Sequence, residues 1–250
     1  MSEAPRLGAA RAFAIFALVF GAQIIYGFVV VILGVILLMA QGANPGDSAA
    51  VARMMGQLNA PLLLVSVAAG AIVLFGIMEI WAHNWLRDRG ATGFGELKKP
   101  RQQFAIATAS GFALAAAYFA LVRLFPPSKE MAGPLAQMAA SSAAARAAWA
   151  VIAVAIAPPT EEVLFRGLLL KGFTESWGAI PASIAVTLLF TVSHLFEVAR
   201  YWPAALTIFT LAIATLVIRV RTGSVASAIV LHMAYNTVLV AIMYAGKWLV

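Results

Sequence analysis

The residues best suited to chemistry form a short charged stretch beside a long apolar one. Two adjacent carboxylates, Glu161 and Glu162, and the guanidinium of Arg166 follow an apolar run over residues 147–157. A charge at the centre of a bilayer costs roughly 2.5–3.5 kcal/mol on insertion scales, so such groups need partners, water or both, and are functional by default. Glu162 and Arg166 are four residues apart and can pair on one helical face, whereas Glu161 points about 100° away and stays free.

Two further polar patterns lie in later apolar runs. Phe190 and His194 are four residues apart, as are His232 and Asn236, so each pair shares one helical face. The chain has three histidines, and two of them are in these runs. The alternative to chemistry is structural: a buried ion pair would lock helices together, and the other polar groups would be hydrogen-bonding links between helices.

Together these carboxylates, imidazoles and the carboxamide suit two kinds of hydrolysis. In the first, a carboxylate takes a proton from water while donors on the opposite side stabilise an oxyanion. In the second, Glu161, His194 and His232 hold a divalent metal such as zinc and leave one coordination position open for water. The residue types alone do not choose between these mechanisms.

The composition predicts a membrane protein. The 250 residues are 63% hydrophobic, against about 45–50% in a typical soluble domain. Only helices and closed barrels satisfy every backbone group in lipid, and the apolar runs do not alternate as barrel strands would. The absence of cysteine excludes disulfides, a cysteine nucleophile and a thiolate metal site. The net charge of +7 comes from basic residues between the apolar runs, which indicates control of topology and not nucleic-acid binding.

The expected fold is an all-α polytopic bundle of seven transmembrane spans, or eight if residues 128–146 also insert. We expect one integral membrane domain over residues 1–250, with the chemistry in residues 147–248. The fourth span should kink at Pro158 and Pro159 and be followed by a short turn at residues 171–178. The predicted spans cover approximately residues 11–40, 61–86, 104–125, 147–170, 179–196, 203–218 and 225–248.

The distribution of basic residues predicts a cytosolic N-terminus, because loops rich in Lys and Arg stay on the cytosolic side. At 1.5 Å per residue from the predicted cytosolic ends, Glu161 lies about 15 Å deep and His232 about 12 Å. His194 lies about 22 Å deep on the same arithmetic. A tilt of the fifth span, or the kink at Pro158 and Pro159, would remove this difference in depth.

The three motifs resemble those of type II CAAX prenyl endopeptidases, also called CPBP intramembrane proteases. Glu-Glu-x-x-x-Arg, Phe-x-x-x-His and His-x-x-x-Asn occur in that order on successive late helices, and the resemblance covers roughly residues 158–237. It implies that Glu161 activates water, with Glu162 and Arg166 in support. It also implies that His194 positions or polarises the water, and that His232 and Asn236 stabilise the oxyanion. The family has been described both as metal-dependent and as metal-free, and we expect metal-free chemistry without a cofactor.

The resemblance implies an intramembrane endopeptidase that cleaves a peptide bond near the cytosolic face. Its partners would be the bilayer and a peptide or protein substrate. Eukaryotic members cleave the last three residues of prenylated proteins at the endoplasmic reticulum, but many bacterial relatives lack prenylated partners. The compact chain suggests a bacterial cell-membrane protein, and leaves the substrate and the oligomeric state open. Two alternatives are a non-enzymatic immunity or scaffold protein of the same family, and a small proton-coupled transporter.

Overall fold

The computed structural model describes residues 7–40, 42, 44, 46–81, 93–128, 131 and 142–245. These residues form helices joined by short connections, and no β-strand occurs among them, which confirms the predicted fold class. In chain order the elements are α1 (Gly8–Ala40), α2 (Ser48–Trp81), α4 (Pro100–Leu124), α6 (Ala143–Val151), η2 (Ile152–Ile156), α7 (Ala157–Glu162), η3 (Val163–Leu169), α8 (Leu170–Trp177), α9 (Ala179–Ser193), α10 (Leu195–Val198), α11 (Trp202–Thr222) and α12 (Val225–Tyr244).

The elements from α6 to α8 form one continuous helix, in which η2 and η3 are π-helical. The predicted fourth span, 147–170, is too short at both ends, and the turn predicted at residues 171–178 is wrong. The helix continues because Leu170, Gly172 and Phe173 are buried on one side, while Lys171 and Glu175 form an ion pair of 3.8 Å on the other. It ends at Gly178, whose φ of 85° favours glycine.

Several of these helices are suited to a bilayer. Five described segments are long and apolar enough to cross one: Gly8–Leu37, Pro100–Leu124, Ala143–Trp177, Trp202–Thr222 and Val225–Tyr244. The second predicted span lies largely within the long helix α2, and the fifth corresponds to a shorter apolar helix at Ala179–Ser193. Large apolar side chains of α1, such as Ile25 and Phe28, are exposed, as expected of a surface that faces lipid. The chain is therefore an integral membrane protein, while the number of spans stays a prediction because most of residues 128–146 lie outside the described residues.

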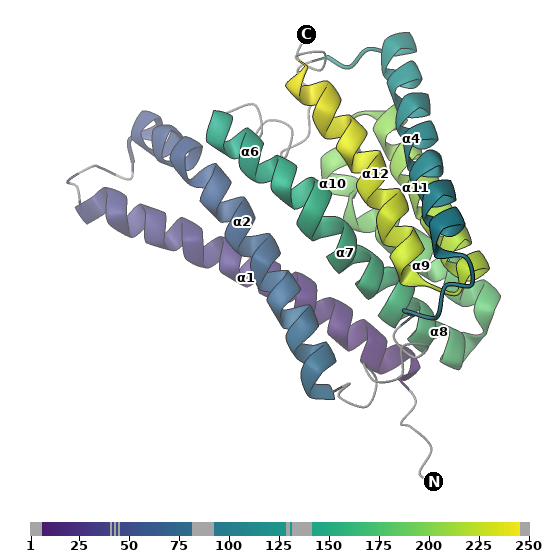
Figure 1. Cartoon of the computed structure of the whole chain (residues 1–250). Helices are drawn as coiled ribbons and strands as arrows, with labels where there is room; N and C mark the ends of the chain where they lie inside the picture. Colours follow the sequence, from purple (N-terminus) through teal and green to yellow (C-terminus); the bar gives the residue numbers. More distant parts are fainter. Residues whose placement is uncertain are drawn as a thin grey trace.

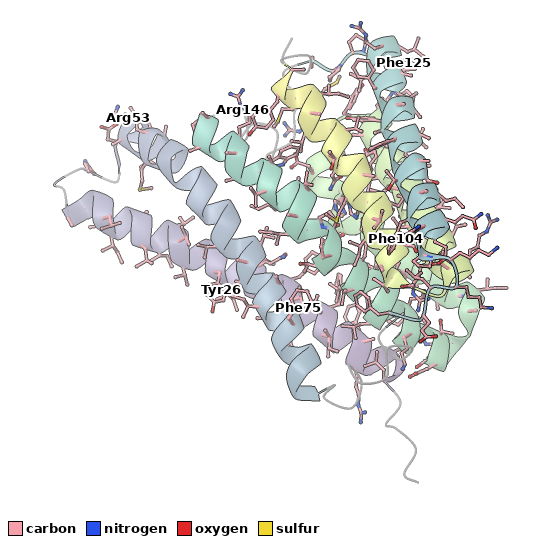
Figure 2. All side chains as sticks on the ribbon, in the orientation of Figure 1. Tyr26, Arg53, Phe75, Phe104, Phe125 and Arg146 are labelled. Atoms are coloured by element: carbon pink, nitrogen blue, oxygen red, sulfur yellow. The ribbon has the colours of Figure 1, made fainter. Side chains whose placement is uncertain are left out.

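The continuous helix separates α1 and α2 from α4, α11 and α12 (Figure 1), and the described residues form two apolar cores. One core joins the inner face of α1 to η3, α8 and α9 through residues such as Val19, Phe165 and Phe190. The other joins α4, α11 and α12 through Ala115 and Leu231, among others. Arg53 and Arg146 lie at the end of the bundle opposite the start of α1 (Figure 2).

The start of α1 is capped by a helix that lies far away in sequence. Oε2 of Glu175 accepts hydrogen bonds from the backbone N–H groups of Leu7 and Gly8, at 2.8 and 3.2 Å. The hydroxyl of Ser176 accepts a third, at 2.8 Å, from the N–H of Ala9. The first N–H groups of a helix have no partner within it, and a carboxylate there also complements the helix dipole. The end of α8 therefore fixes the beginning of α1.

Close packing of α4 against α12 depends on Gly111. A Cβ atom at this position would lie 2.8 Å from Cβ of Ala234 and 2.9 Å from the backbone nitrogen of Tyr235. Because a backbone atom cannot move aside as a flexible side chain can, a larger residue must push α12 away. Gly111 thereby holds α12, which carries His232 and Asn236, against the bundle.

We expect Gly111→Ala to lower the free energy of unfolding by about 2–3 kcal/mol, since overpacking is most costly where the neighbours are rigid. The measurement is the thermal unfolding midpoint of the purified protein in one detergent. Gly21→Ala is the matched control, because a Cβ atom at Gly21 would meet nothing within 4 Å. An unchanged midpoint in Gly111→Ala would contradict the tight contact with α12.

Candidate active site

The first motif contributes an ion pair that is removed from solvent. Glu162 ends α7 and Arg166 lies one turn later in η3, and the side chains of both are 0% exposed. Nε of Arg166 lies 3.3 Å from Oε2 of Glu162. Nη2 of Arg166 donates a 2.9 Å hydrogen bond to the carbonyl of Ala212 in α11. The pairing expected from the four-residue spacing is thus present, and it ties the continuous helix to α11.

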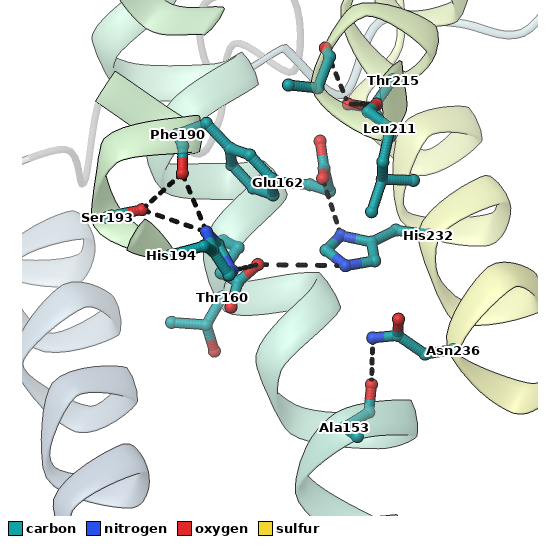
Figure 3. Close-up of polar contacts among 12 residues, drawn as sticks. Ala153, Thr160, Glu162, Phe190, Ser193, His194, Leu211, Thr215, His232 and Asn236 are labelled. Atoms are coloured by element: carbon teal, nitrogen blue, oxygen red, sulfur yellow. Dashed lines mark hydrogen bonds and ion pairs between the residues drawn. The ribbon is translucent and has the colours of Figure 1, made fainter. Parts of the chain in front are cut away.

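The other oxygen of Glu162 orients His232 from α12. Nδ1 of His232 lies 2.9 Å from Oε1 of Glu162, and both side chains are buried (Figure 3). An ionised carboxylate only accepts hydrogen bonds, so Nδ1 of this imidazole carries the proton. The Nε2 atom of His232 is therefore turned away from Glu162 and toward the neighbouring Glu161.

His194 is held in the same manner by a backbone group. It lies in the turn between α9 and α10, just after the last residue of α9 and not within a span as predicted. Its Nδ1 atom lies 2.8 Å from the carbonyl of Phe190 and 3.2 Å from the hydroxyl of Ser193 (Figure 3). A carbonyl can only accept, so Nδ1 of His194 donates and Nε2 is left free.

Both free nitrogens face one oxygen of Glu161. Oε2 of Glu161 lies 3.8 Å from Nε2 of His194 and 3.9 Å from Nε2 of His232. These distances are too long for direct hydrogen bonds, and this oxygen is buried without a hydrogen-bond partner among the described residues. The side chains of Glu161 and His194 are each 26% exposed, so the cluster can be reached from outside. One carboxylate oxygen and two imidazole nitrogens thus converge around a gap.

The helical hairpin of α8 and α9 explains why His194 reaches this cluster. Glu161 lies 17 residues before the turn at Gly178 and His194 lies 16 residues after it, so both are about 25 Å from that turn at 1.5 Å per residue. Figure 1 shows α8 extending below the lower ends of α11 and α12. The depth difference predicted from the sequence arose because it assumed level helix ends and ended the fourth span too early.

Asn236 is tied to a carbonyl that the proline pair leaves without a donor. The N–H of Ala157 donates to Ile152, five residues back, and Pro158 has no N–H to offer Ala153. The side-chain Nδ2 of Asn236 donates to the carbonyl of Ala153 instead, at 2.7 Å (Figure 3). One N–H of Asn236 is used in this way, and the carboxamide keeps a second one.

Three contributors to the site were not assigned a role from the sequence. The ring of Phe190 packs against the guanidinium of Arg166, 4.3 Å from centroid to Cζ, and against the imidazole of His194, with centroids 4.6 Å apart. A cation above an aromatic face is stabilised by the ring quadrupole. The carbonyls of Ala153 and Ala212 are the other two. Of the three, only the Ala153 carbonyl could have been identified from the sequence, because Pro158 lacks the N–H that would bind it.

The converging atoms also fit a divalent metal by their chemistry. One carboxylate and two imidazoles are ligands that zinc prefers, and a second hydrogen bond from each Nδ1 is the usual support for such ligands. The orphaned oxygen of Glu161 would be the third ligand. As they stand, no three or more of the described His, Asp and Glu side chains are close enough together to form a metal site. Glu161, His194 and His232 are suitable ligands by type, but their side chains would have to move closer together to bind one metal ion.

The comparisons with known proteins bear on the same part of the chain. Residues 143–238 match the family model described as type II CAAX prenyl endopeptidase Rce1-like. The matched stretch holds the carboxylate pair, Arg166, both site histidines and Asn236. No curated protein and no solved structure matches the chain. The family resemblance expected from the motifs is therefore confirmed, and the chain contains, over residues 143–238, an Rce1-like domain of the type II CAAX prenyl endopeptidases.

Proposed function

We propose that this protein is an intramembrane endopeptidase in which Glu161 and His194 activate a water molecule. The family match supports a membrane peptidase of the CAAX-protease type. The observation that carries the proposal is the gap between Oε2 of Glu161 and the two Nε2 atoms, at 3.8 and 3.9 Å. Polar atoms at such distances are typically bridged by water. A water has two protons to donate, so bonds to Glu161 and His194 leave its lone pairs free to attack a carbonyl carbon.

In this mechanism the proton of the attacking water passes to Glu161. The water oxygen bonds to the carbonyl carbon of the scissile peptide, and the carbonyl oxygen becomes an oxyanion. The proton held by Glu161 then passes to the leaving nitrogen as the carbon–nitrogen bond breaks. General base catalysis of this kind contributes about 10²–10⁴-fold to the rate.

His232 and Asn236 are the proposed donors to the oxyanion. Asn236 retains one N–H beyond the bond to Ala153. With a proton on each ring nitrogen, His232 donates a hydrogen bond from Nδ1 to Glu162 and a second one from Nε2 to the oxyanion. Donors already in position are the largest single source of catalysis in acyl transfer.

The scissile bond would lie near the end of the bundle where α1 begins. His232 lies eight residues after Ser224, the residue that precedes α12, which corresponds to about 12 Å at 1.5 Å per residue. We assign this end to the cytosol because it holds the basic residues around α4 and α11, including Arg101 and Arg221. A peptide or protein substrate, lipidated or not, would be cleaved there, in a bacterial cell membrane.

Glu161→Gln should lower kcat by about 10²–10⁴-fold, because a carboxamide of the same shape cannot take the proton. The measurement is cleavage of a quenched-fluorescence peptide library by purified protein in detergent. Glu96→Gln, which changes an exposed carboxylate before α4, is the matched control and should keep full activity. Full activity of the Glu161→Gln protein would exclude Glu161 as the base.

Removal of metal ions should leave the activity intact, since the proposed chemistry needs only water and protein groups. The test is dialysis of the active protein against a chelator, with elemental analysis before and after. If activity is lost and zinc restores it, the ligands would be Glu161, His194 and His232. In that case the metal would supply Lewis-acid activation of the water.

A further inference from the structure

The proline pair before the carboxylates removes donors from the helix that carries them. In η2 the N–H of Ala157 donates to the carbonyl of Ile152. Pro158 and Pro159 have no N–H, so the next backbone donor along the chain is that of Thr160. The carbonyls of residues 153–155 therefore share at most one N–H from their own helix.

One of these carbonyls has no partner that the helix can supply. Asn236 satisfies the carbonyl of Ala153. The α-helical donor to the Val154 carbonyl would be residue 158, and the π-helical donor would be residue 159. Both residues are prolines and have no N–H. No side chain among the described residues donates to Val154 either. Its carbonyl is an open acceptor in the middle of a membrane helix.

The open acceptor lies on the helix that carries the catalytic cluster. Val154 precedes Glu161 by seven residues, which corresponds to about 10 Å along the helix at 1.5 Å per residue. Backbone carbonyls point toward the C-terminal end of a helix, here toward α7 and Glu161. Val154 is half-buried and Ala155 is exposed, so this face is not sealed by packing. Within a bilayer an unpaired carbonyl is unfavourable unless it meets water or a polar ligand.

We propose that the carbonyl of Val154 accepts a hydrogen bond from a backbone N–H of an extended peptide substrate. This inference rests on the proposed peptidase function and assigns a substrate-binding group to it. A peptide entering the bilayer loses the water that satisfied its own N–H groups, so the bond relieves an unpaired group on each side. Recognition of the main chain also fits a site that binds extended peptides, as when a peptide adds a strand to a sheet edge.

The test measures peptide binding apart from hydrolysis. The Glu161→Gln protein is used to select a fluorescein-labelled peptide from a random library, and the Kd is measured by fluorescence anisotropy. Ester analogues then replace each backbone N–H of that peptide with oxygen, one at a time. One ester should weaken binding about threefold to tenfold, the range of a single hydrogen bond.

Pro159→Ala in the same Glu161→Gln protein returns a donor to Val154 in the five-residue register that Ala157 follows, and so closes the acceptor. The parent peptide should then bind about threefold to tenfold more weakly, and the sensitive ester should carry no further loss. Pro158→Ala returns the α-helical donor of Val154 and is the second variant if Pro159→Ala does not fold. Pro181→Ala is the matched control, because Pro181 lies in the first turn of α9, where an added N–H closes no carbonyl.

The inference is overturned if no ester weakens binding, if no peptide binds, or if the ester penalty is the same with proline and with alanine at position 159. The last result would mean that water and not substrate meets the Val154 carbonyl. Failure of the native protein to cleave any peptide, with the coupling intact in the Glu161→Gln protein, would instead refute only the proposed hydrolysis.

Discussion

The arrangement of the site depends on one ion pair that is fully removed from solvent. Removing one partner of such a pair costs about 3–5 kcal/mol, because the other charge is left buried and alone. Glu162 also orients His232 from α12, and Arg166 also binds the Ala212 carbonyl of α11 and packs on Phe190 of α9. A single pair therefore joins the continuous helix to the three helices around it and orients His232 at the cluster.

Irregular stretches of the continuous helix are compensated by its neighbours. The carbonyl of Ala153, freed by a proline and a π-helical turn, accepts from Asn236. The carbonyl of Arg166, in the second π-helical stretch, accepts a 3.2 Å hydrogen bond from Nε of Arg219. Departures from α-helical geometry in a membrane need such outside partners. Each link draws another helix toward the residues that carry the chemistry, so the irregularity itself helps to assemble the site.

The sequence predicted the fold class and the identity of the polar residues because both follow from local pattern. Continuous apolar runs indicate membrane helices, and the spacing of Glu162 and Arg166 indicates a pair on one face. The height of His194 could not be predicted, because it depends on how far the hairpin at Gly178 extends past its neighbours. The bond from Asn236 to Ala153 was equally inaccessible, since it requires the approach of α12. The roles assigned to the site residues stay predictions.

The cap on α1 has a consequence for how this protein is made. The N–H groups of Leu7, Gly8 and Ala9 are satisfied by Glu175 and Ser176, which the ribosome adds more than 160 residues later. The first helix must therefore enter the membrane with its leading amides hydrated, and it can dock in its final position only after α8 has been synthesised. The earliest segment of the chain therefore reaches its final place only through a rearrangement after its insertion.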